Sequence, residues 1–149
     1  MSISVKSTWS GKPPSDLSFR VRKAMKEWAD EVQPMVRDAL KAETPVRSGR
    51  MKSSERSMRT FHGDSLRIEF TANTPYARYP IWGTRPHIIR PKAARALHWV
   101  SASGSHFARV VHHPGNAAND FPKRVLGELS DEIKTMLADK IQAALSGRK

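Results

Sequence analysis

Apolar residues recur every three or four positions in two long segments, one toward each end of the chain. The first follows Pro13-Pro14, where Ser15 or Asp16 suits a helix N-cap. Its apolar positions are Leu17, Val21, Met25, Trp28, Val32, Met35, Val36, Ala39 and Leu40. The apolar positions of the second are Phe121, Val125, Leu129, Ile133, Met136, Leu137, Ile141 and Leu145, with Pro122 in the first turn. This spacing predicts two amphipathic helices, and Pro34 predicts a kink near residues 30–32 because it removes a backbone hydrogen bond.

Between these helices the hydrophobic period changes from about 3.6 to two. Leu66, Ile68 and Phe70 alternate with polar residues, and residues 58–62 alternate in the same way. Gly63 and Asp64 separate the two runs, which predicts a β-hairpin. Residues 86–91, 96–101 and 106–113 are also expected to be extended, with a polar loop over 101–105. Residues 76–79 lie between two prolines and predict a single helical turn, which Gly83 ends.

Grouped strands between terminal helices predict an α+β fold, with an antiparallel β-sheet packed against a long N-terminal helix and a C-terminal helix. We expect one domain over residues 15–146, an N-terminal arm over 1–14, and a frayed tail over 147–149. No segment approaches the ~20 apolar residues that span a bilayer, and no signal peptide is visible, so we expect the protein to remain in the cytoplasm in which it is made. Cysteine is absent, which excludes disulfides and thiolate metal sites.

The net charge of +12 is concentrated in the middle of the chain. Residues 44–119 carry twelve Lys or Arg and three acidic residues. No carboxylate lies between Glu69 and Asp120, although five of the six histidines do. Such a distribution indicates contact with something negative, either nucleic acid, an acidic partner or an anionic membrane surface. The alternative is that these charges only keep a crowded surface soluble.

The histidines raise the question of a metal-dependent nuclease. His112 and His113 are followed by Asn116 and Asn119, as in some His/Asn nucleases. Metal-assisted hydrolysis needs two or three converging ligands and a base, whereas adjacent strand residues point to opposite faces. The pattern therefore favours ordinary strand histidines, and we predict no catalytic residue, no metal and no cofactor. The helical carboxylates, including the like-charged neighbours Glu128 and Glu132, are expected to be exposed.

A nucleic-acid-binding module is the stronger alternative. The basic residues of the middle are Arg47, Arg50, Lys52, Arg56 and Arg59, followed by Arg78, Arg85, Arg90, Lys92, Arg95 and Arg109. Tyr76, Tyr79, Trp82 and Trp99 are interleaved with them, as is typical of stacking on bases. The same aromatics are also typical of a core or of subunit contacts. No helix-turn-helix, RNA-recognition or zinc-finger signature is present.

Four sequence segments account for the unusual composition of the middle of the chain better than its charge does. In order around the hairpin they are "ETPVRSGRMKSS", "PYARYPIWGT", "RPHIIRPKAARAL" and "HHPGNAANDF". Together they resemble the minor neck or tail-completion proteins of long-tailed bacteriophages, over residues 17–145. The matching positions are Pro45, Val46, Gly49, Tyr76, Ala77, Tyr79, Gly83, Thr84, Pro91, His113, Pro114, Gly115 and Phe121. Met51 stands where leucine is usual, and Ile81-Trp82 replaces a pair that is commonly a polar residue and Phe.

This resemblance implies a non-enzymatic virion protein, similar in role to the lambda tail-completion protein. Such a protein would assemble in the host cytoplasm as a ring around the DNA channel and would join the tail to the head connector. Its implied partners are its own copies, the adjacent head-connector proteins, and tail-terminator or tail-tube proteins, without a membrane. The residues expected to contact neighbouring subunits are Tyr76, Tyr79, Trp82, Arg85 and His87. Those expected to face acidic proteins or channel DNA are Arg47, Arg50, Arg90, Lys92 and Arg95, and a nonspecific nucleic-acid-binding module remains the alternative.

Overall fold

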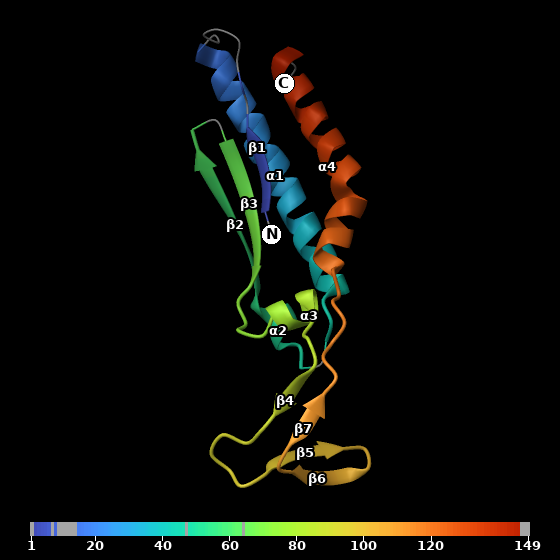
Figure 1. Cartoon of the computed structure of the whole chain (residues 1–149). Helices are drawn as coiled ribbons and strands as arrows, with labels where there is room; N and C mark the ends of the chain where they lie inside the picture. The colour runs from blue at the N-terminus through green and yellow to red at the C-terminus, as the bar shows by residue number, and fades with distance from the viewer. Residues whose placement is uncertain (1, 7, 9–14, 47, 64, 147–149) are drawn as a thin grey trace. The chain divides into compact units, whose positions relative to one another are not determined.

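The structure, a computed structural model, describes residues 2–6, 8, 15–46, 48–63 and 65–146 (Figure 1). The chain forms two compact units. The first unit comprises residues 1–77 and 120–149, and the second, which we call the insert, comprises residues 78–119. No helix within the described ranges is long and apolar enough to cross a membrane.

Within its described residues, the first unit combines three helices with a three-stranded antiparallel sheet. Its helices are α1 (Ser15–Glu43), α2 (Arg50–Ser54) and α4 (Phe121–Ser146), and its strands are β1 (Ser2–Lys6), β2 (Glu55–His62) and β3 (Ser65–Ala72). The strand order is β1-β3-β2, with β3 in the centre. The predicted α+β class, with its two long terminal helices, is confirmed.

The sheet has one apolar and one polar face. In β3, Leu66, Ile68 and Phe70 are buried, and the register places Ile3 of β1 opposite Ile68. Residues between them, such as Arg67 and Glu69, point to the other face because side chains alternate along a strand. Strand β1 was not predicted from the sequence, and it adds Ile3 to the apolar face.

Helix α1 forms the centre of the first unit. Its buried positions are Val21, Ala24, Met25, Trp28, Ala29, Val32, Val36 and Leu40. This buried stripe is wide because α1 contacts β2 and β3 on one side and α4 on another (Figure 1). The buried residues of α4 are fewer, namely Phe121, Val125 and Ile133.

Polar contacts fix α1 against both of its neighbours. The indole Nε1 of Trp28 donates a hydrogen bond of 3.0 Å to the carbonyl of Ile133, inside the α1–α4 contact. Two ion pairs also join these helices, Lys140 with Glu31 at 2.6 Å and Arg124 with Glu43 at 2.6 Å. Because these partners run in opposite order along the two helices, α1 and α4 are antiparallel.

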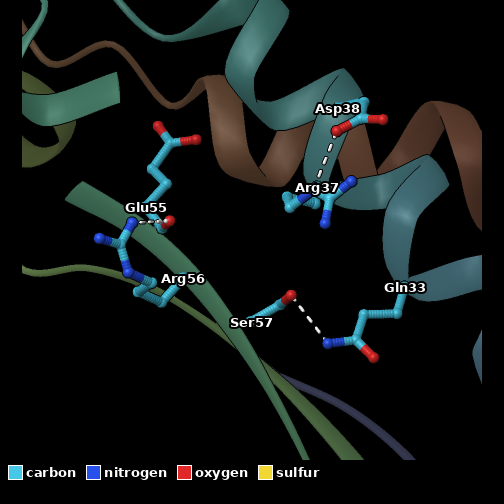
Figure 2. Close-up of polar contacts among 6 residues, drawn as sticks. All are labelled: Gln33, Arg37, Asp38, Glu55, Arg56 and Ser57. Atoms are coloured by element: carbon cyan, nitrogen blue, oxygen red, sulfur yellow. Dashed lines mark hydrogen bonds and ion pairs between the residues drawn. The ribbon is translucent and has the colours of Figure 1, made fainter. Parts of the chain in front are cut away.

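On the sheet side, Gln33 of α1 donates from Nε2 to the Ser57 hydroxyl of β2 at 2.8 Å (Figure 2). Arg59 of the same strand pairs with Asp30. Both contacts come from the side of β2 that shares a face with the buried residues of β3. They therefore hold β2, an outer strand of the sheet, against α1.

The insert contains helix α3 and four short strands. The elements are α3 (Arg78–Trp82), β4 (His87–Ile89), β5 (Leu97–Ser101), β6 (Gly104–Ala108) and β7 (Val111–His113). Strand β4 pairs with β7, and β5 pairs with β6. The prediction of one strand over residues 106–113 was wrong, because the run breaks at Arg109 and Val110 and its two halves pair with different strands.

Two glycines close the base of the insert. Thr84 and Asn116 exchange backbone hydrogen bonds of 2.9 and 3.1 Å. Gly83 and Gly115 flank this bridge with φ of 72° and 88°. A Cβ at Gly83 would lie 2.6 Å from the Asn116 carbonyl oxygen, and one at Gly115 would lie 2.2 Å from that of Thr84. Only glycine therefore permits this close approach of the two segments.

The buried indole allows a direct test of the α1–α4 contact. Trp28→Phe removes the indole N–H that donates to the Ile133 carbonyl. Because Trp28 is only 1% exposed, the smaller phenyl ring also leaves part of a buried space unfilled. We expect the free energy of unfolding to fall by about 1–3 kcal/mol. The control Trp82→Phe, at a side chain that is 74% exposed, should change it by less than about 0.5 kcal/mol. Urea unfolding followed by circular dichroism measures both, and equal losses would contradict the central position of Trp28.

The base of the insert allows a second test. We expect Gly83→Ala to disrupt the bridge between Thr84 and Asn116, because the added methyl overlaps the Asn116 carbonyl. Hydrogen exchange of these two amides, followed by NMR, should accelerate by about tenfold or more. Gly104→Ala is the matched control, since Gly104 also has positive φ but no atom within 4 Å of the position that the added methyl would take. Equal exchange rates in the two variants would show that crowding at the base does not matter.

Candidate subunit-interface surface

The insert has no buried core of its own. None of residues 78–119, all of which the structure describes, is buried. Instead Trp82 is 74% exposed, and Val100 and Phe107 are each 71% exposed. Large apolar side chains that are exposed in this way are typical of surfaces that bind another molecule.

Ring stacking and backbone pairing hold the β5–β6 hairpin together. His98 stacks on Phe107 with ring centroids 4.6 Å apart, and Trp99 stacks on His106 at 5.5 Å. These pairs lie on opposite faces of the hairpin, because neighbouring positions of a strand alternate. An isolated two-stranded hairpin is marginal in water, so cover from another surface would stabilise this one.

The five predicted subunit contacts are divided between the two units. Tyr76 is half-buried in the first unit, whereas Tyr79 and Trp82 lie exposed on α3 of the insert. Arg85 and His87 follow α3 and are also exposed. The structure therefore brings four of the five into the insert.

Local contacts orient some of these side chains. The Arg78 guanidinium lies 4.8 Å from the centre of the Tyr79 ring and donates a 2.8 Å hydrogen bond to its hydroxyl. His87 stacks on His113 of the paired strand at 4.9 Å. Tyr79 and His87 are thus held in place by neighbours within the insert, while Trp82 projects into solvent.

The predicted anion-facing residues are divided in the same way. Arg90, Lys92 and Arg95 lie together in the exposed loop between β4 and β5. Arg50 begins α2 in the first unit and is also exposed. Arg47 lies outside the described residues. The loop from 90 to 96 is therefore where the predicted basic residues gather.

The basic residues of the insert have no acidic partners. The insert contains six Lys or Arg and no Asp or Glu. In the described part of the chain, none of the six has a carboxylate oxygen within 4.0 Å. The insert thus presents uncompensated positive charge together with exposed apolar side chains.

Sequence reasoning missed the exposure of Ile88, Val100 and Phe107. The signal was present, because His98 and Val100 alternate with Trp99 and so place large side chains on both faces of one hairpin. A strand that is apolar on both faces is normally buried. In a hairpin without a covering layer, the same pattern indicates contact with another molecule.

The histidines of the insert lie together in at most one pair, and no third possible metal ligand joins them within the described residues. His112 is exposed, and His113 stacks on His87 and accepts a 3.0 Å hydrogen bond from the Gly115 amide. Among the residues that the structure places, no group of three or more His, Asp or Glu could hold a metal ion.

Part of this chain is similar to one known protein family. No curated protein and no solved structure matches the chain. Residues 15–83 match the HK97-gp10-like family, described as "Bacteriophage HK97-gp10, putative tail-component". The matched range runs from α1 through α3 and ends at Gly83, at the base of the insert. Residues 15–83, a little under half of the chain, are therefore similar to a family of phage tail components, and the predicted resemblance to phage tail proteins is confirmed.

Proposed function

We propose that this protein is a structural component of the phage neck, which completes the tail and joins it to the head connector as a ring of identical copies around the DNA channel. The observation that carries the proposal is the insert, a unit of 42 residues without a buried side chain. A monomer leaves this apolar surface in water, whereas a ring can cover it at each contact between copies. The family match over residues 15–83 supports the phage tail as its setting.

The composition of the insert suits an interface. Pro80, Pro86, Pro91 and Pro114 each restrict φ, so the insert loses less conformational entropy when it is ordered against a partner. Tyr79, Trp82 and Arg85 belong to the residue types enriched at interface cores. In this proposal Tyr76, Tyr79, Trp82, Arg85 and His87 contact neighbouring copies, and no residue has a catalytic role.

The proposed partners beyond the ring are the head-connector proteins on one side and tail-terminator or tail-tube proteins on the other. Arg50, Arg90, Lys92 and Arg95, together with Arg47, would face acidic surfaces of these proteins or DNA in the channel. The protein would assemble in the host cytoplasm and remain in the virion at the head–tail junction.

A nonspecific nucleic-acid-binding module is the second candidate, and the uncompensated charge of the insert favours it. The two candidates differ in what drives binding. Binding through six phosphate contacts would weaken by about a thousandfold or more between 50 and 200 mM salt, because counterions are released. A ring that covers apolar surface depends on protein concentration instead.

Light scattering over a concentration series, with and without short duplex DNA at ~150 mM salt, separates these candidates. We expect a concentration-dependent oligomer whose mass is the same with and without DNA. If the protein neither forms an oligomer by itself nor binds DNA, we expect it to assemble when tail extract is added. A monomer that binds duplex tightly at this salt would contradict the neck proposal and support the nucleic-acid module.

The exposed tryptophan tests the interface itself. We expect Trp82→Ala to raise the concentration at which the oligomer forms by about tenfold or more, since buried tryptophans are frequent interface hot spots. The urea midpoint should not change, because the side chain is 74% exposed. Phe19→Ala is the matched control, a similarly exposed aromatic on α1 at 68%. If both variants weakened association equally, the contact would not be specific to the insert.

A further inference from the structure

A few carboxylates of the described chain have no basic partner, and most of these lie on one helix. Most of those described form ion pairs with Lys or Arg. Among the described residues, those with no basic nitrogen within 4.0 Å are Glu55, Asp120, Glu128, Glu132 and Asp139. Glu55 accepts a hydrogen bond from Thr44 in the first unit. The other four are exposed, and three of them lie on α4.

The three α4 carboxylates share one face of the helix. Glu128 and Glu132 are four residues apart, and Asp139 follows seven residues later, so all three project in nearly the same direction. At 1.5 Å per residue they extend over roughly 16 Å of the helix surface. We call this the acidic face of α4.

Over residues 128–140 of α4 the acidic face lies to one side of the contact with α1, whereas the buried Val125, one turn earlier, projects in nearly the same direction. Ile133, whose carbonyl accepts the Trp28 hydrogen bond, projects about 120° from the centre of the acidic face, at 3.6 residues per turn. Lys140, which pairs with Glu31 of α1, projects about 100° from that centre in the same sense. Since the three carboxylates are also exposed, the acidic face is free for a second molecule.

The basic loop of the insert is the chemical complement of this face. Arg90, Lys92 and Arg95 are three exposed cations within six residues, and they also lack partners among the described residues. Next to them in sequence lie the exposed apolar residues of β4 and the β5–β6 hairpin, including Ile88 and Val100. Burying those apolar groups beside charge pairs lowers the local dielectric and strengthens the pairs.

We infer that the insert of one copy docks on the acidic face of α4 of a second copy, with Arg90, Lys92 and Arg95 against Glu128, Glu132 and Asp139. This inference rests on the proposed ring and names the surface that receives the insert. The contact joins two different surfaces, so every copy offers one of each. Such a heterologous contact closes into a ring when the rotation between copies permits. A contact between two identical patches would stop at a dimer.

Charge reversal on each surface tests the inference. One variant carries Arg90→Glu, Lys92→Glu and Arg95→Glu, and the other carries Glu128→Lys, Glu132→Lys and Asp139→Lys. All six side chains are exposed, so both variants should keep the circular dichroism and urea midpoint of the wild type. Each variant alone should remain at the 16.8 kDa monomer mass at concentrations where the wild type is oligomeric. Mixed in equal amounts the two variants should associate again, because the reversed insert of one now meets the reversed α4 of the other.

The other outcomes are also decisive. If the α4 variant retains the wild-type mass, the insert docks elsewhere and the inference is wrong, while the proposed neck function remains. A further outcome is that the mixture stays monomeric while a chain with all six changes forms the wild-type oligomer. The two surfaces would then pair within one chain, and the inference would be wrong. A wild type that is monomeric at every concentration without DNA contradicts the contact between copies. Tight duplex binding by that monomer would in addition contradict the proposed function.

Discussion

The packing of α1 between the sheet and α4 is the contact on which the first unit depends. Trp28 is almost completely buried there, and its indole N–H is satisfied by the carbonyl of Ile133, so the side chain buries a large apolar area without leaving that donor unpaired. Because α1 is covered on two sides, α4 has to contribute only one side to the core. The remaining surface of α4 can therefore carry exposed charged residues, including the three carboxylates of the acidic face.

The insert has the opposite physical organisation. Its shape comes from the backbone bridge between Thr84 and Asn116, from the close approach that Gly83 and Gly115 permit, and from stacked rings. None of these depends on a buried core, so the insert can expose Trp82 and Phe107 without unfolding. The family match covers α1 to β3 of the first unit and α3 of the insert, and it ends at Gly83 beside this bridge. The rest of the insert and α4 lie outside the match, and they carry most of the surfaces by which we propose that this chain binds its own copies.

The elements with a clear hydrophobic period could be predicted from sequence, and those without one could not. Helices α1 and α4 and the β2–β3 hairpin follow from periods of 3.6 and two that continue over many residues. Strand β1 has only Ile3 and Val5 as apolar positions, and its partner β3 is about sixty residues away, so no local pattern indicates it. The break at Arg109 was missed because the alternation continues through it, and only the pairing with separate partners reveals it. Aromatic and basic residues pointed to the insert as a binding surface, but which of them are exposed depends on the absence of a covering layer, which is a tertiary property.

The net charge of +12 places a further constraint on any assembly of this chain. Like-charged copies repel one another at long range, so a ring needs a local attraction that survives this repulsion. At physiological ionic strength the repulsion is screened beyond about 8 Å, whereas charges in direct contact are screened much less. The proposed pairing of the basic loop with α4 satisfies this condition, because it uses three cations and three carboxylates that have no partner within the described chain. It leaves the total charge unchanged, so the assembled ring retains +12 for each copy. In the proposed neck, a ring with that surplus would suit a position between acidic neighbours and channel DNA.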